Sequence, residues 1–185
     1  MKQAKLLTDA EFRRLNAIVN SLRYPTRNQT AIALSFYAGL RACEIAALKV
    51  DDVFDETGLV KDTIYMSAAQ TKGSDGATVL VNSKLQRQLE RFGQQYPVHS
   101  SNRAAPLIFS AKGGGFTAQT VVNLFKRIYQ SAGIDGASRQ FVTNLADKRI
   151  NARVVQALAR HKHLSITQHY IDINDNKLRA EVELL

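Results

Sequence analysis

The sequence has a single cysteine, Cys43, so the chain cannot form an intramolecular disulfide. It has no cluster of cysteine and histidine at the spacing of a structural zinc site. It also lacks a long apolar run near its start, because residues 1–7 are followed by the polar stretch TDAEFRR, which supports neither a signal peptide nor a membrane span. No internal repeat or low-complexity tract occurs. These absences favour a cytoplasmic protein in a reducing compartment.

Acidic residues are scarce relative to basic ones. The 25 Lys and Arg residues outnumber the 16 Asp and Glu residues, which gives a formal net charge of +9. This balance makes a polyanionic partner the first to consider, although ribosomal, RNA-binding and membrane-surface proteins share it. With 185 residues, of which 45% are hydrophobic, the chain can bury a proper core, and we expect one domain over residues 1–185.

Apolar periodicity predicts a mainly helical fold with one β region. Helices are expected over residues 8–22, from about Asn28 to Ala38 with Pro25 in the preceding break, and directly beyond Gly39. The runs TIYM and TVLV, separated by turn residues, predict a β-hairpin. Further helices are expected over residues 83–96 and 117–132 and in the stretches VVQALAR, SITQHYI and NDNKLRAEVELL. The fold class is therefore mainly α with a small antiparallel sheet, in one folding unit.

On the helix over residues 117–132, five apolar residues recur at helical spacing and predict a buried face: Val121, Val122, Leu124, Phe125 and Ile128. The other side of this helix is basic or polar.

Two basic residues stand at positions suited to binding a phosphate. Arg41 opens a helix after Gly39, where its guanidinium and the helix amides can both meet an anion. The alternative is that Arg41 and Glu44 form an ordinary surface ion pair. Lys72 lies in the hairpin turn, where its long side chain can reach a nucleic-acid backbone or simply be solvated.

A third group of polar residues lies in ARHKHLSITQHYI, at residues 159–171. It brings two histidines, His161 and His163, and Tyr170 close to a basic residue. The histidines alone could bind a metal, but no third ligand accompanies them at a convincing spacing, so we expect no metal site.

These segments resemble the tyrosine recombinase (phage integrase) family, of the Xer-like type. AGLRACEIAALKVDDV resembles its first arginine box, and the hairpin with Lys72 resembles its lysine-bearing turn. ARHKHLSITQHY is similar to its terminal box, in which Gly-His is followed nine residues later by a nucleophilic tyrosine, as His161 is by Tyr170. Arg160 stands where that glycine is usual. Order and spacing agree over essentially the whole chain.

The resemblance implies the catalytic-domain fold of DNA breaking-rejoining enzymes and a site-specific recombinase or integrase activity. Tyr170 would attack the scissile phosphate and form a 3′-phosphotyrosyl link, without metal or other cofactor. Arg41 and His161 would donate to the phosphoryl oxygens, and Lys72 would protonate the leaving 5′-oxygen. Glu44 and Thr167 would be structural. A relaxing enzyme like the type IB topoisomerases is a weaker reading of the same chemistry.

The sequence departs from the family pattern before Phe141. A second box, His or Lys followed by two residues and a second catalytic arginine, should stand where GIDGASRQFVTNLA stands. That segment is several residues too short, and Arg139 matches the neighbour of the catalytic arginine better than the arginine itself. Three explanations compete. A loop is missing from the given residues and the numbering runs across the gap, or the protein carries a natural or engineered deletion. In the third explanation, Arg139 takes the place of the second catalytic arginine from a shifted backbone. The alternative function is a catalytically impaired DNA-binding module of the same fold.

The resemblance also implies partners. Double-stranded DNA is the expected substrate, and tetramers on paired sites are expected through the C-terminal stretch NDNKLRAEVELL, unless that helix packs on its own core. The family's N-terminal core-binding domain is expected to be absent, in a naturally minimal enzyme or an excised fragment. Charge and helical placement suggest five DNA-phosphate contacts: Lys126, Arg127, Lys148, Arg149 and Arg153.

Overall fold

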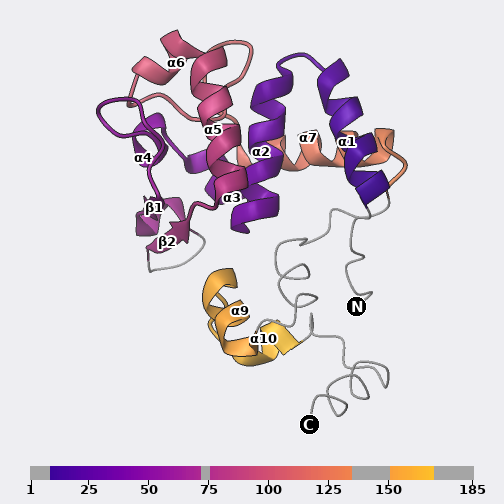
Figure 1. Cartoon of the computed structure of the whole chain (residues 1–185), viewed down its shortest axis with the longest axis vertical. Coiled ribbons are helices and arrows are strands. Elements are labelled where there is room, and N and C mark those ends of the chain that lie inside the picture. The colour runs from indigo at the N-terminus through magenta and orange to yellow at the C-terminus, as the bar shows by residue number, and fades with distance from the viewer. Residues whose placement is uncertain (1–8, 72–75, 135–150, 169–185) are drawn as a thin grey trace.

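The structure, a computed structural model, describes residues 9–71, 76–134 and 151–168 (Figure 1). Helices dominate these residues, and the only sheet found among them is a two-stranded antiparallel hairpin, which confirms the predicted fold class. In chain order the elements are α1 (Asp9–Ser21), α2 (Pro25–Ala38), α3 (Ala42–Ala47), α4 (Val50–Val53), β1 (Thr63–Met66), η1 (Ala68–Gln70), β2 (Ala77–Leu80), α5 (Ser83–Gln95), α6 (Pro97–Ser101), α7 (Ala118–Ser131), α9 (Ala152–Ala159) and α10 (Leu164–Gln168).

Helix α2 begins at Pro25, so the prediction that Pro25 lies in the break before the helix was wrong. The reason is that proline is favoured in the first helical turn, where its missing N–H would have had no partner and its fixed φ already suits the helix. Tyr24, at a φ of 60°, makes the sharp entry into α2. The predicted end at Ala38 is confirmed.

Polar side chains cap the first turns of three other helices, as their types favour. Asn82 accepts hydrogen bonds from the amides of Lys84 and Leu85 at the start of α5. Thr117 accepts from the amide of Thr120 at the start of α7. Asn151 accepts from the amide of Arg153 at the start of α9. These caps fix where the helices begin, and they explain why the predicted starts near residues 83 and 117 were close.

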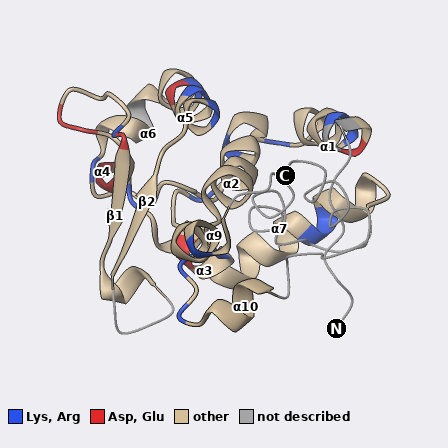
Figure 2. Cartoon of the chain, turned by 60° about the horizontal axis from the view of Figure 1, so that its bottom comes forward, with Lys and Arg blue, Asp and Glu red and all other residues tan. Residues whose placement is uncertain are grey.

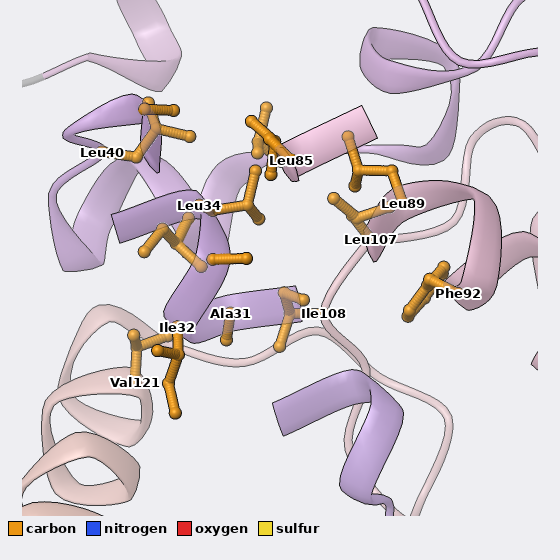
Figure 3. Packing of buried hydrophobic residues seen from close by; sticks show 14 of the residues in the cluster. Ala31, Ile32, Leu34, Leu40, Leu85, Leu89, Phe92, Leu107, Ile108 and Val121 are labelled. Carbon is orange, nitrogen blue, oxygen red and sulfur yellow. The ribbon is translucent and has the colours of Figure 1, made fainter. Parts of the chain in front are cut away.

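The apolar core lies where α2 packs against α5 and where α3 packs against α7 (Figure 3). Leu34 from α2 faces Leu85 and Leu89 from α5, and all three are fully buried. Leu107 and Ile108, from the segment after α6, complete this layer. Burying side chains of this size contributes about 1.5–3 kcal/mol each, so this layer dominates the stability of the fold.

Helix α7 buries a narrower face than its sequence predicted. Val121, Leu124 and Ile128 are buried, as expected. Val122 is 44% exposed, so its assignment to the apolar face was wrong. The physical reason is that Val122 points about 100° away from Val121 and lies one turn from the exposed Lys126, at the edge of the buried face.

The hairpin buries one face and leaves the other open. Ile64 pairs with Val79 and both are buried, whereas Tyr65 and Leu80 are exposed. The second strand is Ala77–Leu80, one position earlier than the predicted TVLV run. The turn that carries Lys72 lies outside the described residues, as does the predicted helix NDNKLRAEVELL.

The described residues from 9 to 134 form a unit that we call the body, and residues 151–168 form the α9–α10 segment. Figure 1 shows α9 and α10 at one end of the molecule, below the helices of the body. Helix α9 packs against α10. None of the described helices is both long enough and apolar enough to cross a membrane.

Candidate phosphate-binding site

A left-handed turn at the end of α2 brings Arg41 to the start of α3. Gly39 has a φ of 66°, a conformation that favours glycine. Its amide donates to the carbonyl of Ser35, and the amide of Leu40 donates to the carbonyl of Leu34. The chain therefore reverses within two residues, and Arg41 becomes the residue that caps α3, as predicted.

Arg41 and Glu44 form an ion pair, but it is not a surface pair. Arg41 Nη1 lies 2.9 Å from Glu44 Oε1, and the backbone amide of Arg41 donates to Glu44 Oε2 at 2.7 Å. The Glu44 side chain is 1% exposed, whereas that of Arg41 is 44% exposed. The buried carboxylate of Glu44 thus accepts hydrogen bonds from the Arg41 amide at the start of α3 and from one nitrogen of the Arg41 guanidinium. The rest of the Arg41 side chain is partly exposed to solvent.

A second arginine reaches the same carboxylate from the α9–α10 segment. Arg160 Nη2 donates to Glu44 Oε2 and to the carbonyl oxygen of Gly39, both at 3.0 Å. Arg160 itself ends α9 with a φ of 55°, and its side chain is 15% exposed. Figure 2 shows α9 lying over α3 in the view from that end of the molecule. Glu44 is therefore the common partner of two guanidiniums that are far apart in sequence.

His161 follows Arg160 and is held by contacts within its own segment. Its Nδ1 shares a hydrogen bond of 2.9 Å with the hydroxyl of Thr167, which is fully buried. Its backbone amide donates to the carbonyl of Gln156, and the Gln156 side chain donates back to the His161 carbonyl at 3.1 Å. These contacts orient the imidazole and fix the backbone on either side of it.

Two of the four predicted catalytic residues, Arg41 and His161, lie among the described residues. Arg41 contacts Glu44, Glu44 contacts Arg160, and His161 is the next residue in the chain. Lys72 and Tyr170 lie outside the described residues. The chain that leads to Lys72 does meet α3, because the Gln70 side chain donates to the carbonyl of Ala47.

The other predicted site residues also lie partly inside and partly outside the described residues. Lys126 and Arg127 are exposed on α7, and Arg153 is exposed on α9. Arg139, Lys148 and Arg149 lie outside the described residues. The full sequence is continuous through Ser138 and Arg139, so the explanation by an unobserved loop was wrong, and the short segment is a property of the chain.

The described cluster has the chemistry of an anion site. Two guanidiniums share one buried carboxylate, so positive charge and N–H donors exceed what that carboxylate can satisfy. Within the described residues, no group of three His, Cys, Asp or Glu side chains could hold a metal ion. A phosphate group, with several oxygens at short spacing, fits such an arrangement of donors.

Two contacts of this site were missed from the sequence. Arg160 was noted only as a departure from a family glycine, and Thr167 was given no more than a structural role. Their partners explain this: Arg160 meets residues 116 and 121 positions away, and no local pattern identifies them. The bond from Thr167 in α10 to His161, which follows the end of α9, joins residues of different elements, so the periodicity of a single helix does not report it.

The chain belongs to the phage integrase family. A sequence model described as the Phage integrase family matches residues 5–177, which is most of the chain. Among its relatives, the chain is 24% identical to tyrosine recombinase XerA of Pyrococcus horikoshii over 187 residues, covering 97% of this chain and 60% of the relative. It is 29% identical to tyrosine recombinase XerD of Ralstonia nicotianae over 162 residues, covering 83% of this chain and 51% of that protein.

Solved structures show the same fold. The crystal structure of XerA recombinase matches with a TM-score of 0.74 and 20% identity, over 99% of this chain and 66% of that one. XerH site-specific recombinase bound to its difH substrate matches with a TM-score of 0.70 and 20% identity, over 98% of this chain and 54% of that one. The fold is thus that of the tyrosine recombinases, and the chain spans about three fifths of the length of its XerA relatives.

Proposed function

We propose that this chain is the catalytic unit of a site-specific DNA recombinase that breaks and rejoins strands through Tyr170. The observation that carries the proposal is the cluster around Glu44. The family resemblance pairs Arg41 and His161 at one phosphate, and the residue before His161, Arg160, shares the Glu44 carboxylate with Arg41. Membership of the phage integrase family supports the same reaction.

The proposed reaction is a transesterification that conserves the phosphodiester. The Tyr170 oxygen forms a bond to phosphorus and gives its proton to water, while the bond from phosphorus to the 5′-oxygen breaks. Lys72 donates a proton to that leaving oxygen. Arg41 and His161 donate hydrogen bonds to the phosphoryl oxygens, where negative charge builds during the attack. Rejoining is the same reaction in reverse with a 5′-hydroxyl as the nucleophile.

A duplex with a nick close to the cleavage position tests the proposal, because the short released strand diffuses away and traps the covalent complex. We expect a protein–DNA adduct that resists denaturing electrophoresis. Tyr170→Phe removes the nucleophilic oxygen and should abolish the adduct, while Tyr129→Phe, a buried tyrosine of α7, serves as the matched control. An adduct that persists in Tyr170→Phe would rule out Tyr170 as the nucleophile.

The second candidate function is DNA binding without strand cleavage. The specific observation in its favour is the short segment at Ser138 and Arg139, where the family's second arginine box is missing. Losing one donor to the transition state typically lowers a rate on the order of 10²–10³-fold. A protein that binds duplex DNA but forms no adduct would favour this function over recombination.

The proposed partner is double-stranded DNA in the cytoplasm. Lys126, Arg127 and Arg153 are exposed and are proposed to contact backbone phosphates, together with Lys148 and Arg149. The net charge of +9 supports binding that weakens as salt rises. Assembly into tetramers on paired DNA sites is proposed from the family resemblance, and residues 1–185 are proposed to act as one catalytic domain.

A further inference from the structure

Arg160 adopts a backbone conformation that is unfavourable for a residue with a Cβ atom. Its φ of 55° lies in the left-handed region, which glycine adopts freely and residues with a Cβ adopt rarely. Among the described residues other than glycine, only Tyr24 shares a positive φ. The presence of an arginine at this position is explained by its guanidinium rather than by its backbone.

The guanidinium of Arg160 uses one of its three nitrogens to join the two regions. Nη2 donates to both Glu44 and the Gly39 carbonyl. Nε and Nη1 are buried, and neither has a hydrogen-bond partner among the residues that the structure describes. A buried donor without an acceptor is unfavourable, so these two nitrogens can accommodate an incoming oxygen acceptor.

Arg27 shows how this fold treats a buried arginine that is purely structural. Its Nε and Nη2 both donate to the side-chain oxygen of Asn28, and its Nη1 donates to the carbonyl of Phe109. All three nitrogens are therefore satisfied within the body. Arg160 differs because the groups around it satisfy only one nitrogen, although both arginines are largely buried.

The missing acceptor is best supplied by an anion. Both oxygens of Glu44 already accept hydrogen bonds, Oε1 from Arg41 and Oε2 from Arg41 and Arg160. The Arg41 guanidinium lies on the same carboxylate and is partly exposed. A phosphate can therefore bridge the two guanidiniums, because its oxygens can accept from more than one donor at once.

We propose that Arg160 is a second phosphate-binding arginine of this site and that it contacts the same DNA phosphate as Arg41. This inference rests on the proposed DNA-binding function. Glu44 then has a defined part: it holds both guanidiniums on one carboxylate before DNA arrives. The residue after Arg160, His161, is carried to the same phosphate by the turn that ends α9.

Two substitutions and a matched control test the inference. Arg160→Gly relieves the left-handed backbone, and Arg160→Gln keeps a neutral donor for Glu44, so at least one variant should fold. Arg91→Gln, at an exposed position on α5, removes the same charge outside the cluster. The probe is a fluorescent DNA duplex, and its dissociation constant is measured by anisotropy over a range of salt concentrations. Thermal denaturation of each variant checks its folding.

Loss of one phosphate contact should lower the slope of log affinity against log salt by about one. We expect this for Arg160→Gly and Arg160→Gln, with DNA binding at least several-fold weaker than in Arg91→Gln. The double variant Arg41→Gln/Arg160→Gln should lose less affinity than the two single losses combined, since both side chains share one phosphate. Strict additivity would overturn the shared contact.

The adduct assay separates this inference from the proposed reaction. If the unmodified protein forms the adduct, Arg160→Gly should lower its rate of formation on the order of 10²-fold or more. If the unmodified protein binds DNA without an adduct, strand cleavage is wrong but the salt dependence still decides the role of Arg160. Variants of Arg160 that bind and cleave DNA as well as the control would show that Arg160 is only a structural tie. A protein that does not bind DNA at all overturns both.

Discussion

The body is held together by an apolar core, whereas the α9–α10 segment is joined to the body by polar contacts. Every residue of the main apolar cluster comes from the body, from Leu15 to Ile134. The α9–α10 segment buries Val155, Ala159 and Thr167, but none of them belongs to that cluster. Among the described residues, Arg160 links the two regions through hydrogen bonds to Glu44 and to the carbonyl of Gly39.

This difference shows how the candidate site combines a rigid half with a weakly attached half. Arg41 stands on a helix whose neighbours are fully packed, whereas His161 stands on a short helical pair outside the core. Regions with few buried apolar contacts open locally at lower free energy than the core does. We therefore expect the two halves to respond separately to substitution, and the predictions that follow test this in order of expected effect.

The largest effect is expected from Phe92→Ala, which removes a fully buried ring from the core of the body. Truncating a buried phenylalanine typically costs about 3–5 kcal/mol, through lost burial and the cavity that remains. Urea denaturation followed by circular dichroism measures the change. Because α9 and α10 depend on the body, their signal should be lost in the same transition.

Val122→Ala is the control for the core substitution, because Val122 is exposed on α7. Its effect should stay within about 0.5 kcal/mol. A comparable loss of stability in both variants would contradict the assignment of the core.

The next effect is expected from Glu44→Gln, which acts at the joint between the regions. The amide keeps one acceptor and presents an N–H to donors that now lack a partner, so we expect a cost of about 2–3 kcal/mol. Hydrogen exchange should distinguish the regions, with amides of α9 exchanging at least about tenfold faster and those of α2 changing less. If amide exchange became faster by the same factor in α2 and α9, the distinction between a rigid and a weakly attached half would be wrong.

A smaller effect is expected from Thr167→Val, which keeps the shape of a fully buried side chain but removes its hydroxyl. His161 Nδ1 then loses its hydrogen bond with the Thr167 hydroxyl, at a cost of about 1–2 kcal/mol. The change should be confined to α9 and α10 and is measured by hydrogen exchange at those amides. Thr167→Ser retains the hydroxyl and should exchange like the unmodified chain; if it behaves like the valine variant, packing rather than the hydrogen bond is responsible.

The smallest effect is expected in the pH dependence of stability, and it arises from Asp55 in the body. The hydroxyl of Thr57 and nearby amides donate to Asp55 and lower the pKa of its carboxyl below the ordinary value. Its contribution to stability is therefore present above the ordinary pKa of an aspartate and is lost as pH falls through the lowered value. Melting temperatures of the unmodified chain and Asp55→Asn should differ slightly at neutral pH and converge in acid. A gap that widens in acid would reverse the sign.

Most elements of the body could be predicted from the sequence, because local patterns decide them. Leu15 and Val19 recur at helical spacing and are buried in α1. The short helices α4 and α6 were not predicted, since elements of four and five residues are too brief to show a period. Pro25 was misplaced because a proline can end one helix or open the next.

The candidate site could be predicted only in part. Arg41 and His161 were identified from motifs that are local in sequence, and the structure places Arg41, together with the neighbour of His161, Arg160, at Glu44. The role of Arg160 depends on contacts with Gly39 and Glu44, which are formed by folding across most of the chain. No periodicity or turn signal reports such a contact, so only the three-dimensional arrangement reveals it.

Glu44 and Arg160 lie 116 positions apart in the sequence, and this separation bears on the order in which the molecule assembles. Closing so long a loop is entropically unfavourable until much of the intervening chain is structured, and contacts of high sequence separation slow folding. We therefore expect the pairing of these two side chains to be among the last events of folding. A nascent chain would complete its body first and acquire its anion-binding centre only when α9 docks.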